Sequence, residues 1–178
     1  SNNTITNNVA SNNFTGILHS HSHNNTLSDN TVSNNSKGID LSFSGDNNLT
    51  GNIVASNSHE GILLSSSINN VLTDNTISTN ANGILIQDID GESNNNEIYN
   101  NNFIGNATQA EFLLQGVSGN VFNLATPTGG NYWSDFDTLA EGCTNANSDN
   151  FCDAPYIFSG GQDDFPWPKQ YLPARPAT

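Results

Sequence analysis

The sequence predicts an all-β fold: a right-handed parallel β-helix of about five coils with an aromatic-rich C-terminal cap. Three observations predict it. Gly-Ile pairs begin at residues 16, 38, 61 and 83, short apolar runs alternate with polar residues, and Asn recurs between the runs. A repeat of roughly 22 residues with period-two runs is typical of stacked strand-and-turn coils. Leucine-rich repeats have a similar period but need more Leu and a helical half.

Each coil contributes residues to the same vertical columns. Two apolar columns are expected to point inward: Ile5, Leu27, Leu49, Leu72, Ile98, and Val9, Val32, Val54, Ile77, Phe103. A third core column, three residues after each repeated Gly, comprises His19, Leu41, Leu64 and Ile86. Asn8, Asn30, Asn52, Asn75 and Asn101 form a polar column. Inward Asn at a corner can bond to the next coil, so a ladder is expected there.

The chain divides into three parts. Residues 1–125 carry the coils, residues 126–165 form a capping segment, and residues 166–178 are a Pro-rich tail. Most aromatic residues lie late in the chain: Tyr132, Trp133, Phe136, Phe151, Tyr156, Phe158, Phe165, Trp167 and Tyr171. A solenoid end exposes apolar core and strand edges, so these aromatics are expected to form the cap. Trp133 and Trp167 are alternative candidates for stacking on glycans.

Composition excludes several classes of function. With 3 basic and 17 acidic residues the net charge is -14, which excludes phosphate-based binding of nucleic acid. No apolar run is long enough to span a bilayer. The chain has no Met and no signal peptide, and we expect a mature or excised part of a secreted protein. Nothing in the sequence indicates an organic cofactor.

The repeat units resemble a known family. NNTLSDNTVSNNSKGIDL, NNLTGNIVASNSHEGILL and NNVLTDNTISTNANGILI are similar to the parallel β-helix repeats of NosD-like proteins. The later stretches GGNYWSDFD and DAPYIFSGGQDDFPWP resemble the segment that closes many archaeal surface β-helices. The resemblance implies an extracellular or cell-surface protein, with a periplasmic location as the alternative. The family name also implies copper handling, although the chain has no Met and its two Cys are expected to be paired.

The segment between the cysteines is a candidate calcium loop. Oxygen donors stand at the alternating positions that such a loop uses: Asn145, Asn147, Asp149, the Phe151 carbonyl and Asp153. Asn150 replaces the usual Gly and Tyr156 replaces the usual Glu, so millimolar affinity is expected. In an extracellular chain, Cys143 and Cys152 are expected to form a disulfide that pins this loop.

Three of the four histidines lie in one stretch, GILHSHSHNN. We expect His19 to face inward and His21 and His23 to lie at the turn, where a metal site is one hypothesis. Lys37 aligns beside the coil that carries His59 and Glu60. These three side chains are candidates for a small active site, or for a simple Lys37–Glu60 ion pair. The enlarged coil carries Asp88, Asp90 and Glu92, which are expected to form a solvated acidic loop.

Six sequons permit glycosylation, at Asn2, Asn13, Asn24, Asn34, Asn48 and Asn106. The leading functional hypothesis is a non-catalytic surface protein that assembles with itself or other surface proteins through its ends. The alternatives are a carbohydrate-binding or carbohydrate-processing β-helix, and a NosD-like periplasmic copper protein. The three hypotheses differ in the partner: protein subunits for the surface protein, glycans for the carbohydrate-binding or carbohydrate-processing β-helix, and copper for the NosD-like protein.

Overall fold

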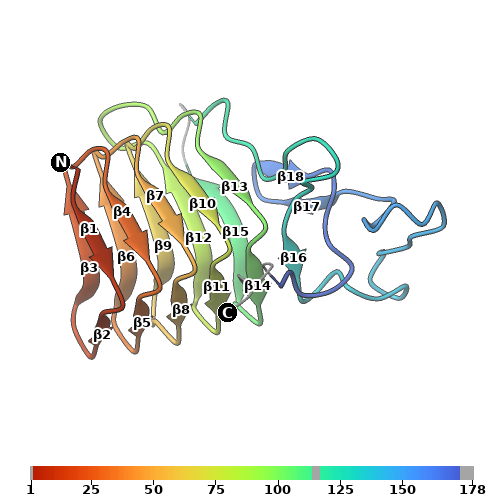
Figure 1. The fold of residues 1–178 in the computed structure, drawn as a ribbon, viewed down its shortest axis with the longest axis horizontal. Helices are drawn as coiled ribbons and strands as arrows, with labels where there is room; N and C mark the ends of the chain where they lie inside the picture. Colours follow the sequence, from red (N-terminus) through yellow and green to blue (C-terminus); the bar gives the residue numbers. More distant parts are fainter. Residues whose placement is uncertain (1, 114–116, 173–178) are drawn as a thin grey trace, which may run out of the picture.

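The structure, a computed structural model, describes residues 2–113 and 117–172. Stacked coils form a rod with the N-terminus at one end and the cap at the other (Figure 1). The last six residues of the expected Pro-rich tail lie outside the described residues. The described part of the chain contains no helix long and apolar enough to cross a membrane.

Three parallel sheets form the walls of the rod. Sheet A contains β1 (Thr4–Thr6), β4 (Thr26–Ser28), β7 (Asn48–Thr50), β10 (Val71–Thr73) and β13 (Glu97–Tyr99). Sheet B contains β2 (Val9–Ser11), β5 (Thr31–Ser33), β8 (Ile53–Ala55), β11 (Thr76–Ser78), β14 (Asn102–Ile104) and β16 (Tyr132–Trp133). Sheet C contains β3 (Thr15–Ser20), β6 (Lys37–Ser42), β9 (Glu60–Ser65), β12 (Asn82–Gln87) and β15 (Thr108–Leu113). The predicted parallel solenoid of about five coils is confirmed.

The register confirms most of the predicted columns. Ile5 pairs with Leu27 in sheet A, and His19 pairs with Leu41 in sheet C. The expected place of Val9 in the second column is wrong by one residue: Ala10 pairs with Val32, and Val9 is exposed. Strand side chains alternate between the two faces, so this shift turns Val9 outward. The aliphatic columns of the later coils are buried and make one continuous core.

Asparagine ladders fix the corners between strands. At the A–B corner the ladder comprises Asn8, Asn30, Asn52, Asn75, Asn101 and Asn131. At each step the backbone N–H and the carboxamide Nδ2 donate to Oδ1 of the next coil's Asn, as Asn52 does to Asn75 at 2.9 Å for both bonds. A second ladder at the B–C corner comprises Asn13, Asn35, Asn57, Asn80 and Asn106. The predicted polar column is therefore a ladder, and it is one of several.

Two more ladders lie in the return segment from sheet C to sheet A. They comprise Asn3, Asn25, Asn47, Asn70, Asn96 and Asn120, and Ser22, Ser44, Ser67 and Ser93. Most ladder residues follow a residue with positive φ, such as Asp29 before Asn30 and Asp46 before Asn47. Asn and Asp tolerate this conformation better than other side chains. The enrichment in Asn therefore follows from both the turn and the ladder.

The repeated Gly residues lie where the chain bends from the B–C corner into sheet C. A Cβ atom at Gly61 would lie 2.7 Å from Asn80 Nδ2 and 2.8 Å from the Gly83 carbonyl oxygen. Both atoms belong to the coil packing itself, so no larger residue fits without moving a coil. The Gly-Ile pairs that reveal the period thus mark one corner of the first four coils, and Gln109 takes the place of Gly in the fifth.

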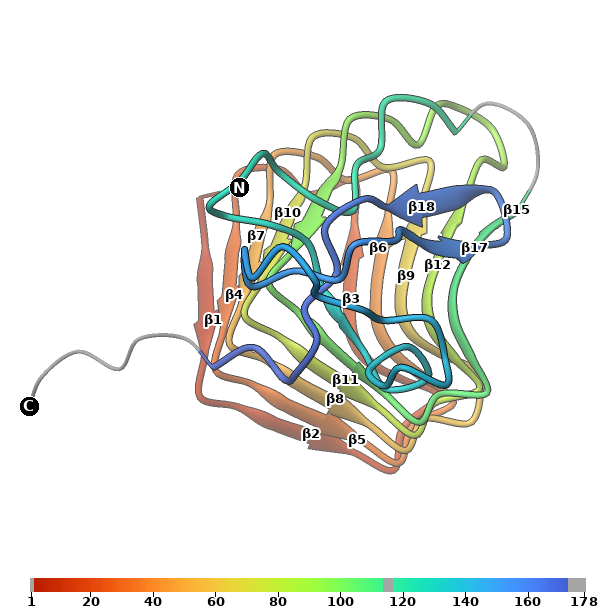
Figure 2. The same cartoon turned by 90° about the vertical axis from the view of Figure 1, so that its right-hand side faces the viewer.

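The cap closes the C-terminal edge of each sheet. Val121 pairs with Glu97 of sheet A, β16 extends sheet B, and Ser159 pairs with Glu111 of sheet C. The antiparallel hairpin of β17 (Tyr156–Phe158) and β18 (Gly161–Asp163) lies across the end of the coils (Figure 2). The predicted aromatic cap is therefore present in the structure.

Candidate functional site

The histidine stretch belongs to the first coil and does not converge on one point. His19 is the last residue but one of β3 and faces inward; it is 7% exposed, and its Nδ1 has no hydrogen-bond partner among the described residues. Burial lowers the pKa of His19, which favours the neutral ring. His21 has positive φ, as expected at a corner, and its ring stacks on Phe43 at 5.0 Å. His23 is exposed and pairs through its backbone with Gly45.

A shallow groove of about 360 Å³ connects this stretch with the enlarged coil. It is lined by His23, Phe43, Ser44, Ser66, Ile68 and Glu92. The enlarged loop reaches back because the N–H groups of Ile89 and Asp90 donate to Ser66 Oγ at 3.2 and 3.3 Å. Glu92 thereby lines the same groove as His23. Sequence reasoning treated the two stretches separately, although their shared corner position in the repeat was a usable signal.

The hypothetical active site around Lys37 has a different set of contacts. Lys37 Nζ lies 3.5 Å from Asp40 Oδ2 on its own strand, and His59 Nδ1 lies 3.0 Å from Ser36 Oγ. The expected Lys37–Glu60 ion pair is wrong, since Lys37 turns along β6 toward Asp40. Glu60 Oε2 is buried and has no hydrogen-bond partner in the part of the chain that the structure describes. Lys37 therefore pairs with Asp40, and His59 contacts Ser36 instead of Lys37 or Glu60.

The cysteine loop is organised by its own side chains. Cys143 and Cys152 form a disulfide with Cα atoms 4.9 Å apart, as predicted. Asp149 Oδ1 accepts the Phe151 N–H at 3.0 Å, and Asp153 Oδ2 accepts the Ala146 N–H at 2.8 Å. The hydrogen bonds from Ala146 and Thr144 lower the pKa of Asp153. Calcium binding by this loop stays a prediction.

Of the two tryptophans that are alternative candidates for stacking on glycans, Trp133 is excluded by its burial, while stacking on Trp167 stays a prediction. Trp133 is 0% exposed, stacked between Phe103 at 4.4 Å and Tyr156 at 4.3 Å. It therefore has no face left for a sugar ring. Trp167 is half-buried, and its Nε1 donates to Asn100 Oδ1 at 3.1 Å. Both side chains hold the cap on the coils.

Asp163 is a key residue that sequence reasoning missed. It is fully buried at the end of the A–B ladder, where its Oδ2 accepts the Asn131 N–H at 2.6 Å and Trp133 Nε1–H at 2.9 Å. Its carboxylate thus occupies the place of the next carboxamide oxygen. Burial raises the pKa of Asp163 to about 7, and the N–H donors act in the opposite direction. No sequence signal marked it out among the acidic residues of the loop.

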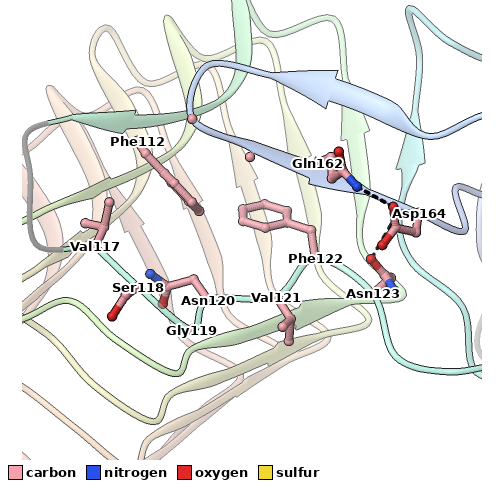
Figure 3. Close-up of a pocket in the computed structure, with 12 residues that line it drawn as sticks. Phe112, Val117, Ser118, Gly119, Asn120, Val121, Phe122, Asn123, Gln162 and Asp164 are labelled. Carbon is pink, nitrogen blue, oxygen red and sulfur yellow. Dashed lines mark hydrogen bonds between the residues drawn. The ribbon is translucent and has the colours of Figure 1, made fainter.

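A cavity of about 400 Å³ lies between the last coil and the cap hairpin (Figure 3). Phe112 and Phe122 form its apolar side, while Asn120, Asn123, Gln162 and Asp164 contribute polar groups. Gln162 Nε2 donates to Asp164 Oδ1 at 2.6 Å, and the Asp164 N–H donates to Asn123 Oδ1 at 2.9 Å. Asn120, the last residue of its ladder, lines the cavity, and no hydrogen bond among the described residues uses its backbone N–H.

The structure separates the sequons into accessible and inaccessible positions. The exposed ones are Asn2, Asn13, Asn24, Asn34 and Asn48. Asn106 is 8% exposed and donates to the Ile77 carbonyl at 3.0 Å within its ladder. Asn106 is therefore poorly accessible in the folded protein, and glycosylation of the sequons stays a prediction.

Comparison with known proteins finds one family. The sequence model of the family described as periplasmic copper-binding protein (NosD) matches residues 1–138. Comparison with curated proteins and with solved structures finds no match.

The donors present in this chain do not fit a copper centre. The chain has no Met, and both Cys are bonded to each other, so the soft donors that Cu(I) prefers are lacking. His19, His21 and His23 point to different surroundings, and no three His, Cys, Asp or Glu side chains gather within residues 2–113 and 117–172. The family model matches more than half of the sequence, and the matched residues include all the coils. The chain therefore belongs to the NosD family.

Proposed function

We propose that this chain is a non-catalytic structural element outside the cytoplasm, a rigid rod that takes part in a surface-layer, sheath or filament assembly. The continuous side-chain ladders carry this proposal. Asn30, Asn52, Asn75 and Asn101 are almost fully buried, and each bonds to the coil before and the coil after it. A buried polar network in which every member is satisfied rigidifies a fold.

The location is supported by two observations. The Cys143–Cys152 disulfide suits an oxidising compartment, and the family is described as periplasmic. The net charge of -14 keeps such a rod soluble and away from anionic surfaces. We place the protein at the cell surface, with the periplasm as the alternative.

Electron tomography of cells that make the protein tests this role. We expect ordered density that persists when the exposed His21, His23 and His59 are all replaced by Gln, because these three rings lie outside the buried core of the coils. The density should be lost in Asn52→Ala, which weakens one ladder. Copper handling predicts instead that the histidine variant is impaired and that Asn52→Ala is not. A wild type without ordered density would contradict the structural role.

A second candidate function is binding of an uncharged glycan in the cavity of Figure 3. It is favoured by an aromatic wall at Phe112 and by the amide and carboxylate groups of Asn120, Asn123, Gln162 and Asp164. Sugar hydroxyls both donate and accept, so they suit such a mixed set. Titration with neutral oligosaccharides, with Gln162→Ala as the matched variant, tests it: binding that is unchanged in Gln162→Ala would contradict this site.

A further inference from the structure

One of the sequons, Asn48-Leu49-Thr50, lies on a strand with its acceptor amide facing outward. Leu49 is fully buried in the core, and strand side chains alternate, so Asn48 and Thr50 share the outer face of sheet A. An N-linked sequon needs a hydroxyl two residues after the acceptor Asn. Asn48 is exposed, and it therefore presents its amide together with that hydroxyl.

The other accessible sequons have different surroundings. Three of their Asn residues have positive φ and lie in turns: Asn2, Asn24 and Asn34. The Asn13 carboxamide donates to the Ser11 carbonyl at 3.0 Å. The Asn48 carboxamide, by contrast, makes no hydrogen bond within residues 2–113 and 117–172. Its Nδ2, the atom to which a sugar is attached, can therefore react without the loss of a contact.

An acidic residue also distinguishes this sequon. Asp46 is exposed and stands two positions before Asn48. Ser, Ser, Val and Ile stand at that spacing before Asn13, Asn24, Asn34 and Asn106. Asp46 Oδ1 accepts a hydrogen bond from Asn69 Nδ2 at 3.3 Å, which holds the carboxylate beside sheet A. An exposed carboxylate in a fixed position gives a glycosyl-transferring enzyme a charged group to bind next to the acceptor.

A groove of about 410 Å³ adjoins the acceptor. Its lining residues include Asp46, Asn48, Asn69, Val71, Thr73 and Tyr99. Val71 pairs with Asn48 in the next coil, and Tyr99 pairs with Thr73 one coil further toward the cap. Each step between coils is about 4.8 Å, so the groove extends about 10 Å along the rod from Asn48 to Tyr99.

The lining of this groove suits sugar rings. Val71 and Tyr99 are half-buried and provide apolar surface, while Thr73 provides a hydroxyl. Sugar rings have C–H faces that stack on aromatic side chains, and hydroxyls that both donate and accept. The net charge of -14 favours uncharged sugars over acidic ones. A chain of neutral sugars that begins at Asn48 can therefore lie along the groove.

We infer that Asn48 carries an N-linked oligosaccharide whose first sugars lie in the groove over Val71, Thr73 and Tyr99. In the transfer, Nδ2 forms a bond to the anomeric carbon of a lipid-linked oligosaccharide, and the bond from that carbon to the lipid phosphate oxygen breaks. The lipid phosphate leaves with the electron pair, and a base of the transferase takes one amide proton. The inference rests on the proposed location outside the cytoplasm and is independent of the rod's role in an assembly.

Peptide mass spectrometry of the protein purified from the cells that make it tests the attachment. The peptide that contains Asn48 should carry the added mass of an oligosaccharide, and Asn48→Gln should remove it. Thr26→Ala destroys the sequon at Asn24 and is the matched control, which should leave the modification at Asn48 unchanged. A non-reduced digest of the same sample also reports the Cys143–Cys152 link. Unmodified Asn48 in protein with linked cysteines would overturn the inference and leave the proposed location intact, whereas unmodified Asn48 with free cysteines would contradict both.

Nitration of tyrosines by tetranitromethane tests the position of the sugars. Tyr99 should react about threefold more slowly in the wild type than in Asn48→Gln, because a stacked sugar covers one face of the phenol ring. Tyr156 lies in the cap, outside the groove, and should react equally in both proteins. Thr50→Ala removes the same sugars and is the second variant should Asn48→Gln not fold. An equal rate for Tyr99 in the wild type and the variants would overturn the placement of the sugars in the groove.

Discussion

Replacing Asp163 with Ala should detach the cap from the coils. The carboxylate accepts N–H groups from Asn131 and Trp133 through Oδ2, and from Phe165 through Oδ1 at 3.0 Å. Asn131 and Trp133 are fully buried, so water has no ready access to replace the lost acceptor. The substitution leaves donors from the last ladder residue and from the centre of the aromatic cap without partners.

The expected loss of stability in Asp163→Ala follows from the two fully buried N–H donors, those of Asn131 and Trp133. Each buried donor left without a partner costs about 1–3 kcal/mol, which gives about 2–6 kcal/mol for Asn131 and Trp133 together. A central value of about 4 kcal/mol corresponds to a fall in melting temperature of about 8–16 °C for a chain of this size. Phe165 is only half-buried, and its N–H can bond to water.

Thermal melts followed by far-ultraviolet circular dichroism and by tryptophan fluorescence measure the loss. Fluorescence reports the cap, since Trp133 and Trp167 both lie there. Asp164→Ala is the matched control: Asp164 is exposed, and the change should stay within about 0.5 kcal/mol. Equal shifts for Asp163→Ala and Asp164→Ala would refute the reasoning that the buried carboxylate ends the ladder.

Four other outcomes are expected from the same contacts. Burial raises the pKa of Asp163 to about 7 from 3.8, so its contribution to stability is present below about pH 4 and is lost as pH rises through 7. Melts between pH 4 and 8 should therefore show a decline that Asp163→Asn lacks. Asn52→Ala should lower the free energy of unfolding by about 2–5 kcal/mol in urea, because it interrupts a buried ladder. Reduction of Cys143–Cys152 should destabilise the loop by about 3 kcal/mol, seen as faster proteolysis within it while the coils melt unchanged. Calcium at about 5 mM should slow that cleavage in the oxidised wild type but not in Asp149→Asn.

Each of these outcomes has a simple control. Asn48 is exposed on β7, and Asn48→Ala should leave the free energy of unfolding within about 0.5 kcal/mol of the wild type. Magnesium at equal concentration separates calcium binding from ionic strength. A pH dependence that is identical in wild type and Asp163→Asn would exclude Asp163 as its source. Cleavage that begins in the coils after reduction would show that the disulfide supports more than its own loop.

The repeat made the coils predictable from sequence. Because stacked coils place like residues above like, the spacing of the Gly-Ile pairs was enough to set the register of the core columns from Leu27 onward. The error at Val9 arose where the first two coils differ in composition: β2 has Ala10 as its inward residue, and Val9 was the more hydrophobic choice. Hydrophobicity alone does not decide which face a residue takes in a three-residue strand.

The cap was less predictable because its contacts have no period. Aromatic enrichment indicated that residues after 126 cover the end, yet it did not show that Trp133 lies at the centre. The role of Asp163 depends on contacts with residues about 30 positions away. From the sequence alone, the neighbouring Asp164 was an equally good candidate for the same role. The groove that joins His23 to Glu92 likewise depends on how far the loop after β12 folds back.

The direction of the ladders explains why the two ends of the rod differ. Inside the rod the backbone N–H of each ladder Asn donates toward the C-terminus, so the last coil is left with backbone donors and the first coil with carboxamide acceptors. A buried N–H without a partner is tolerated less well than an acceptor with a free lone pair. The C-terminal end therefore needs groups that accept, and Gln109 Oε1 accepts from Asn106 at 2.8 Å while Asp163 accepts from Asn131.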